Sequence, residues 1–154
     1  MKLHKSKGFT ILELLVVIAV VGILAAVAIY SLNITRSMSR DSKRVSDVSV
    51  VRAALTQYWL QKASYPTSDA VNLGAAGANA DVLGGNGFSA REQAIEPIFL
   101  QQLPVGPKGG EYYRYHGSAG GYSMSFTTER QTAYGPAGTY YAHSSGVDKV
   151  DQEY

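Results

Sequence analysis

One acidic residue lies inside an apolar stretch near the N-terminus of this 154-residue chain. Glu13 is the single charged residue between Ile11 and Ile29. A charged side chain at the centre of a bilayer costs about 2.5 to 3.5 kcal/mol, and less near the edge, so an acid in such a stretch calls for a positively charged partner. The alternative is that the Glu13 side chain extends to the lipid headgroups and has no further role.

Residues that carry enzymatic or metal chemistry are missing or scattered elsewhere in the sequence. The chain has no cysteine, which excludes disulfides, thiolate metal sites and thiol nucleophiles. His4, His116 and His143 show no ligand spacing such as HExxH. The glycines of residues 84–87 lack the Lys and Ser/Thr of a phosphate-binding loop, and no serine stands in a nucleophile elbow. We therefore expect no catalytic residue, no catalytic metal and a protein that is not an enzyme.

The charge balance argues against a nucleic-acid-binding protein. Lys and Arg total 14 against 12 Asp and Glu, a formal net charge of +2. The isoelectric point of about 8.8 is below that of typical polyanion binders, which also carry a basic stripe. We expect no nucleic-acid contact, and the length allows one domain at most.

The N-terminal residues have the pattern of a membrane-crossing segment. Lys2, Lys5 and Lys7 precede the apolar run, as in a flank that stays in the cytoplasm. The 19 residues of the run span roughly 28 Å as a helix, close to the thickness of the hydrocarbon core. An ordinary signal peptide has a shorter apolar region followed by a small-residue cleavage site.

The segment KGFTILELLVVIAVVGILAAVAI, from Lys7 to Ile29, resembles the class III signal of type IV pilins and type II secretion pseudopilins. The resemblance implies that prepilin peptidase removes residues 1–8 as a leader by cutting between Gly8 and Phe9, and that it then methylates the amino group of Phe9. The new ammonium would lie about one helical turn from Glu13, so the two groups can pair within a subunit or between stacked subunits. The resemblance favours the pair between subunits, which would set the axial register of a filament.

Small residues on the apolar segment allow close helix packing. Gly22 and Ala26 stand four residues apart, a spacing that lets helices approach in lipid or in a filament core. We therefore expect residues 9–30 to form a transmembrane helix that also serves as the filament core.

Residues 31–63 are predicted to continue that helix as an amphipathic stem. No proline occurs before Pro66, and Tyr65–Pro66 should end the helix because proline disfavours the helical region for the residue before it. An apolar stripe with helical spacing is predicted to lie on the head. The stripe consists of Ile34, Met38, Val45, Val48, Val51, Leu55, Tyr58 and Trp59, and the charged residues opposite it are Arg36, Arg40, Lys43, Arg44, Asp47, Arg52 and Lys62.

Residues 64–154 are predicted to form a globular head. Residues 69–87 are rich in Gly and Ala and read as a variable loop, and Ser89–Glu92 fits a capping box that opens helical turns. Residues 111–115 and 121–128 form a predicted hairpin, with a third strand at 138–143. The expected fold class is α+β: a long N-terminal α-helix, transmembrane in front and amphipathic behind, on a small antiparallel β-sheet.

The C-terminal tail gathers the acids Asp148, Asp151 and Glu153. Major pseudopilins hold a calcium ion in a C-terminal loop, but the spacing here does not match an EF-hand, and terminal acidic runs are usually solvated. We expect no cofactor, with calcium as the less favoured alternative.

The resemblance implies a structural subunit of a helical filament, most closely a major pseudopilin of a type II secretion system. It further implies several partners: further copies of the chain, prepilin peptidase, an assembly platform protein, a motor ATPase and minor pilins or pseudopilins. The location would be the bacterial inner membrane, single-pass with a cytoplasmic N-terminus, and then a periplasmic or extracellular filament. Two alternatives stay open: a true type IV pilus or DNA-uptake pilin, and a single-pass anchored domain that binds a ligand or partner.

Overall fold

The computed structural model describes residues 8–151, so residues 1–7 of the predicted leader and Glu153 of the acidic tail lie outside the described residues. The chain divides into two compact units between Arg36 and Ser37. One α-helix, α1 (Ile11–Lys62), supplies residues to both units. It ends where Ala63 takes a left-handed φ of 52°, three residues before Pro66.

The second unit contains a five-stranded antiparallel sheet in the order β1-β4-β5-β6-β7. Its strands are β1 (Ser68–Asn72), β4 (Arg114–Gly117), β5 (Tyr122–Thr128), β6 (Gly138–Ala142) and β7 (Val147–Asp148). The pairing of β4 with β5 and of β5 with β6 confirms the predicted hairpin and third strand, although the first strand begins at Arg114 and not at residue 111. The predicted α+β fold class is therefore confirmed.

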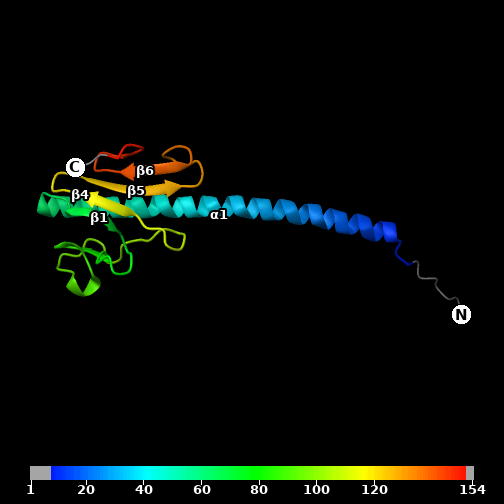
Figure 1. Ribbon diagram of the computed structural model, residues 1–154, viewed down its shortest axis with the longest axis horizontal. Helices are drawn as coiled ribbons and strands as arrows, with labels where there is room; N and C mark the ends of the chain where they lie inside the picture. Colours follow the sequence, from blue (N-terminus) through cyan, green and yellow to red (C-terminus); the bar gives the residue numbers. More distant parts are fainter. Residues whose placement is uncertain (1–7, 152–154) are drawn as a thin grey trace. The chain divides into compact units, whose positions relative to one another are not determined.

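The core of this unit lies between the sheet and the C-terminal part of α1, along which β5 and β6 run in Figure 1. From the predicted stripe, Val48, Val51, Leu55 and Tyr58 are buried. The sheet contributes aromatic side chains to the same cluster, as does the residue just before β4: these are Tyr115, Tyr122, Phe126 and Tyr140 of the sheet and Tyr113. Met38 and Trp59 remain 53% and 44% exposed, so the stripe is narrower than the sequence predicts.

The prediction of a loop over residues 69–87 is wrong at residues 69–72 and 82–84, which form strands. The stretch carries most of β1, all of β2 (Val82–Gly84) and the first residue of β3 (Gly87–Ser89), which pairs with β2 as a hairpin. Leu73 and Leu83 are fully buried within it. The Gly and Ala composition suggested a loop, but small residues here allow segments of backbone to pack closely. A Cβ on Gly85 would lie 2.6 Å from the carbonyl oxygen of Glu96.

The capping box predicted at Ser89–Glu92 is also wrong. Ser89 belongs to β3, and the residue that precedes the single 3-10 turn η1 (Arg91–Gln93) is Ala90, which makes no side-chain cap. The extended β3 pairing removes Ser89 from the capping position, so only one helical turn forms.

The placement of Arg44 on the face opposite the core is wrong, because its side chain is 1% exposed. Its guanidinium donates to both carboxylate oxygens of Glu111, at 2.6 and 2.8 Å, and to Asp41 and Glu129 at 2.6 and 2.8 Å. Arg40 also pairs with Glu129 through two hydrogen bonds. Two loops of the head are thereby held to α1 by a cluster of ion pairs, which we call the Arg44 cluster (Arg40, Asp41, Arg44, Glu111 and Glu129).

Asp41 completes the Arg44 cluster from the helix side. Its carboxylate accepts hydrogen bonds from the backbone N–H groups of Glu129 and Arg130, at 2.8 to 3.1 Å. A buried guanidinium is stable only where its charge and its donors are matched in this way.

The cluster shifts the protonation equilibria of its members in the directions expected for ion pairs. Hydrogen bonds from Arg40, followed by those from Arg44 and Lys108, lower the pKa of Glu129 well below its ordinary value, despite some desolvation. The hydrogen bond from Arg44 likewise lowers the pKa of Glu111. Both carboxylates are therefore ionised in the folded head.

We predict that Arg44→Met destabilises the head by about 3 kcal/mol or more, because it leaves the carboxylates of Asp41 and Glu111 without the guanidinium that pairs with both. The matched control is Arg91→Met, at an exposed arginine that forms no ion pair among residues 8–151. Denaturation of the full chain in detergent micelles, followed by the fluorescence of Trp59, measures both. Equal unfolding midpoints for the two variants would contradict the role of the cluster.

The lowered pKa values also predict a loss of stability in acid. Each such carboxylate stabilises the fold at pH values above its ordinary pKa of 4.5, and this contribution is lost as the pH falls from there toward the folded pKa. The free energy of unfolding should therefore decline below about pH 4.5. At neutral pH the Glu129→Gln variant should be about 1 to 2 kcal/mol less stable than the wild-type chain. Its free energy of unfolding should then fall less steeply as the pH is lowered. Parallel pH profiles for the two proteins would count against the assignment.

Candidate processing and assembly site

The N-terminus of α1 is closed by a reciprocal hydrogen-bond pair between Thr10 and Glu13. Glu13 Oε2 accepts from the backbone N–H and from the hydroxyl of Thr10, both at 2.9 Å. The backbone N–H of Glu13 donates to Thr10 Oγ1 at 3.2 Å. This is a capping box, in which two helix-end donors that would otherwise lack partners are satisfied by side chains.

Sequence reasoning assigned Glu13 but missed Thr10. The signal was present, since Thr-x-x-Glu directly before an apolar run is the pattern of a capping box. Thr10 therefore orients the Glu13 carboxylate toward the first turn of the helix. Among residues 8–151, Thr10 is the residue that donates hydrogen bonds to the Glu13 carboxylate, through its backbone N–H and its hydroxyl.

The predicted cleavage residues lie just before this cap. Gly8 and Phe9 are outside α1 and exposed, with Phe9 85% exposed. A Cβ placed on Gly8 would meet nothing within 4 Å. The bond between these residues is therefore open to an incoming enzyme, and the absence of a side chain at Gly8 is not required by the packing of the described chain.

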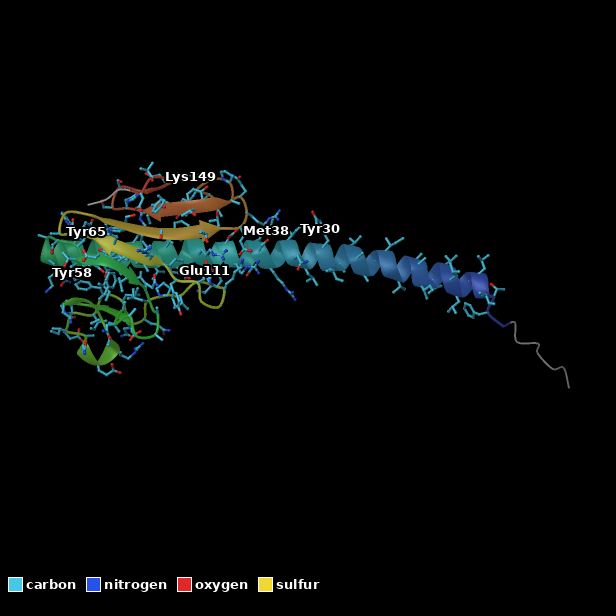
Figure 2. All side chains as sticks on the ribbon, in the orientation of Figure 1. Tyr30, Met38, Tyr58, Tyr65, Glu111 and Lys149 are labelled. Carbon is cyan, nitrogen blue, oxygen red and sulfur yellow. The ribbon has the colours of Figure 1, made fainter. Side chains whose placement is uncertain are left out.

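The apolar segment of α1 is exposed along residues 11–30. Side chains stand out around the helix in the first unit, including the labelled Tyr30, and Ile11 and Ile29 are 85% and 62% exposed (Figure 2). α1 is long and apolar enough to cross a membrane. Gly22 and Ala26 are also exposed, and a Cβ on Gly22 would meet nothing within 4 Å. Their small size therefore has no role in packing within the described chain.

Asp148 and Asp151, the two C-terminal acids among residues 8–151, have separate hydrogen-bond partners. Asp148 Oδ1 accepts the backbone N–H of Val150 at 2.8 Å, and Asp151 Oδ1 accepts the hydroxyl of Ser123 at 2.6 Å. These carboxylates are turned to different partners, and no group of three or more acidic or histidine ligands forms within residues 8–151. The described residues therefore do not fit a bound calcium ion.

Two findings place the N-terminal segment in a class. Residues 3–29 match the family model described as the prokaryotic N-terminal methylation motif. An apolar helix that begins with this motif and continues into an α+β head defines a pilin-like protein.

Curated relatives then identify the family. The chain is 32% identical to type II secretion system core protein G of Vibrio cholerae over 72% of this chain and 71% of that protein. It is 30% identical to the protein of the same name in Klebsiella michiganensis over 73% and 75%. For the Escherichia coli K12 protein the identity is 29% over 78% and 79%. No solved structure gives a significant match. The chain belongs to the type II secretion system core protein G family.

Membership confirms the leading prediction from the sequence, a pseudopilin of the major type. It does not support the alternatives of a true pilus or DNA-uptake pilin or of an anchored ligand-binding domain. The family consists of structural proteins. The apolar N-terminal part of α1 in this chain indicates membrane anchoring.

We predict that Thr10→Ala frays the first turn of α1, since loss of an N-cap side chain costs about 1 kcal/mol. Thr10→Ser is the matched control, because serine supplies the same acceptor. Hydrogen exchange of the first helical turn, measured on the full chain in micelles, should be several-fold faster in the alanine variant alone. Equal exchange in both variants would show that the capping box does not hold the helix end.

Proposed function

We propose that this chain is synthesised as a membrane-stored precursor, cut between Gly8 and Phe9, methylated on Phe9 and assembled into a helical filament as its major pseudopilin. The observation that carries the proposal is the exposed apolar segment of α1, which follows an exposed Gly8–Phe9 bond and holds one oriented acid, Glu13. Membership of the core protein G family supports the same assignment.

In this proposal each part of the chain has one task. Residues 1–8 are the leader, and 9–30 anchor the precursor in the inner membrane and later form the filament core. Residues 31–63 are the stem, and 64–154 form the head. The lysines of the leader favour a cytoplasmic N-terminus, so the head lies on the opposite side of the membrane.

Assembly exchanges one apolar environment for another. Extraction removes the lipid contacts of the exposed apolar side chains, and packing among neighbouring helices replaces these contacts. Gly22 and Ala26 allow the helix backbones to approach closely, and both are uncovered in the isolated chain.

Glu13 is proposed to set the register of the filament. Cleavage creates an ammonium on Phe9, which is costly in an apolar core unless a carboxylate neutralises it. Thr10 holds the Glu13 carboxylate at the helix end, where the ammonium of a neighbouring subunit can reach it. A subunit displaced along the axis would leave both charges unpaired, so the pair selects one axial position.

The assembly requires partners beyond the chain itself. We propose prepilin peptidase for the cleavage and methylation, an assembly platform protein with a motor ATPase for extraction, and minor pseudopilins as further subunits. The support for these partners is the family membership together with the N-terminal methylation motif.

Mass spectrometry of the N-terminal peptide, in strains with and without the peptidase, tests the processing step. We expect a peptide that begins at methylated Phe9 only where the enzyme is present. Gly8→Val should leave uncut precursor in the membrane, without changing the fold, because nothing surrounds the Gly8 Cα. Gly109→Val is the matched control, at a head glycine with equally open space. Normal maturation of Gly8→Val, or an intact Met1 in every strain, would overturn the proposal.

Two variants separate the charge of Glu13 from its capping role. Glu13→Gln keeps an acceptor for the Thr10 donors but removes the charge, whereas Thr10→Ala removes the cap and keeps the charge. Both should be cleaved. We expect Glu13→Gln to lower the yield of sheared filaments at least tenfold, since one unpaired buried charge costs more than about 1.4 kcal/mol, and Thr10→Ala to lower it less. Wild-type yield from Glu13→Gln would remove the role in register.

A further inference from the structure

A cleft of about 410 Å³ lies at the C-terminal end of α1, where the chain leaves the helix and enters the sheet. Its lining comes from the end of α1, the segment that leads into β1, the loop after β1 and the turn between β2 and β3. Tyr58 and Tyr65, both at this end of α1 in Figure 2, contribute to the lining. The volume is within the roughly 300 to 1,000 Å³ of small-molecule sites. The proposed assembly does not use this cleft.

Tyr58 presents a free hydroxyl to this cleft. The residue is 8% exposed, and its ring packs edge-on against Phe99 with 5.3 Å between the ring centroids. Among residues 8–151 the hydroxyl has no hydrogen-bond partner, yet it is not closed off from solvent. Since Tyr58 lines the cleft, this is where the hydroxyl is accessible. Burial raises the pKa of Tyr58, so the phenol keeps its proton and can donate.

The other buried tyrosines of the core show that a free hydroxyl is exceptional in this head. Each of the four donates its hydroxyl to a partner within the chain: these are Tyr113, Tyr115, Tyr122 and Tyr140. Buried tyrosine hydroxyls normally find such a partner, because an unpaired one loses its hydrogen bond to water. The Tyr58 hydroxyl is therefore available to a molecule that enters the cleft.

The lining of the cleft is uncharged within the described residues. Besides Tyr58, its polar side chains include four without a side-chain hydrogen bond among residues 8–151, and these are Ser64, Thr67, Ser68 and Asn79. Hydroxyls and amides can both donate and accept, so they match the hydroxyls of a neutral ligand. An ionised ligand would find no counter-charge. The half-buried rings of Tyr65 and Phe88 add apolar surface.

One wall of the cleft is fixed by contacts with the core. The Tyr115 hydroxyl donates to the carbonyl oxygen of Pro66 at 2.8 Å, and the Tyr65 N–H donates to that of Ala119 at 3.2 Å. The ring of Phe88 packs edge-on against Tyr115, with 4.7 Å between the centroids. A ligand would therefore meet a wall that is already in place, which reduces the entropy lost on binding.

The backbone beside the cleft is a poor template for an added peptide strand. β1 is an edge strand of the sheet, but its pairing register shifts between Ser68 and Val71. Pro66, two residues before β1, has no N–H to donate. A bulge and a proline both interrupt the row of backbone donors that strand addition needs. The cleft therefore favours a ligand that is bound by side chains.

We propose that this cleft binds a neutral carbohydrate, with the Tyr58 hydroxyl donating to a sugar oxygen and the rings of Tyr65 and Phe88 packing against the apolar face of a sugar ring. The Asn79 amide and the three Ser and Thr hydroxyls bind the other sugar hydroxyls. A neutral sugar meets each condition that the cleft sets: it has no charge, it carries closely spaced donors and acceptors, and its ring has an apolar face.

NMR titration of the ¹⁵N-labelled full chain tests the site. The chain is held in micelles of dodecylphosphocholine, because a detergent with a sugar headgroup would compete. The probes are the neutral disaccharides maltose, cellobiose and diacetylchitobiose. We expect at least one of them to shift the amide signals of residues 64–68, 78–79 and 86–88 saturably, with a dissociation constant on the order of 1 mM. No saturable shift of these signals with any of the three would overturn the proposal.

Substitutions in the cleft identify the groups that bind the sugar. Tyr58→Phe keeps the ring that packs on Phe99 and should weaken binding about fivefold, as for the loss of one neutral hydrogen bond. Its stability should not fall, since the hydroxyl has no partner among residues 8–151. Asn79→Gly should also weaken binding, and glycine accommodates the φ of 50° at this position.

The matched control is Tyr112→Phe, at a tyrosine that is 38% exposed and lies outside the lining of the cleft. This variant should keep the wild-type affinity. Wild-type affinity in Tyr58→Phe, or equal weakening in the two tyrosine variants, would overturn the proposal.

Two further ligands test the chemical class. D-Glucuronate should bind more weakly than D-glucose, because the cleft offers no cation to its carboxylate, and equal or tighter binding would contradict a neutral ligand. An uncharged, end-capped peptide of alternating Val and Thr should leave the cleft signals unshifted. Shifts with this peptide and none with the sugars would assign the cleft to a peptide instead. These measurements use the unassembled chain, so their outcome is separate from that of the proposed function.

Discussion

The head depends on the burial of one guanidinium group. Arg44 is placed by a regular turn of α1 beneath two loops that come from distant parts of the sequence, and its donors are shared among Asp41, Glu111 and Glu129. Because a buried arginine cannot be left unmatched, both loops must take their observed positions whenever the helix packs on the sheet. The chain has no disulfide, so this cluster performs the cross-linking of loops that covalent bonds perform in many extracytoplasmic domains.

The two parts of α1 differ sharply in the burial of their side chains. From Ser37 onward, α1 contributes buried residues to the head, whereas residues 11–33 are exposed in the isolated chain. The N-terminal part of α1 is an apolar surface that lipid or other helices can cover, and the part from Ser37 onward is a structural element of a folded unit. A filament subunit needs both, because its head must stay folded while the apolar segment exchanges one set of neighbours for another.

The parts that sequence reasoning predicted well depend on neighbours in the chain. The apolar run, the end of the helix before Pro66 and the strand alternation at residues 121–128 are all local patterns. Its errors concern residues whose partners are remote. Arg44 meets Glu111 and Glu129 across 67 and 85 positions, and its charge suggested a solvated face. Residues 69–87 look like a loop by composition, but β1 gains its order from pairing with β4.

The sequence by itself therefore determined the N-terminal segment. It contains the length of the apolar run, the charged flank, the acid at position 13 and the Thr-x-x-Glu pattern that predicts the Thr10 cap. These features act through the solvent and the first helical turn, which need no tertiary contacts. Only the tertiary structure decided which charges are buried and which loops they hold to α1. The reason is physical, since the environment of a side chain is set by the residues that folding brings against it, and at these sites they come from strands and loops far apart in the sequence.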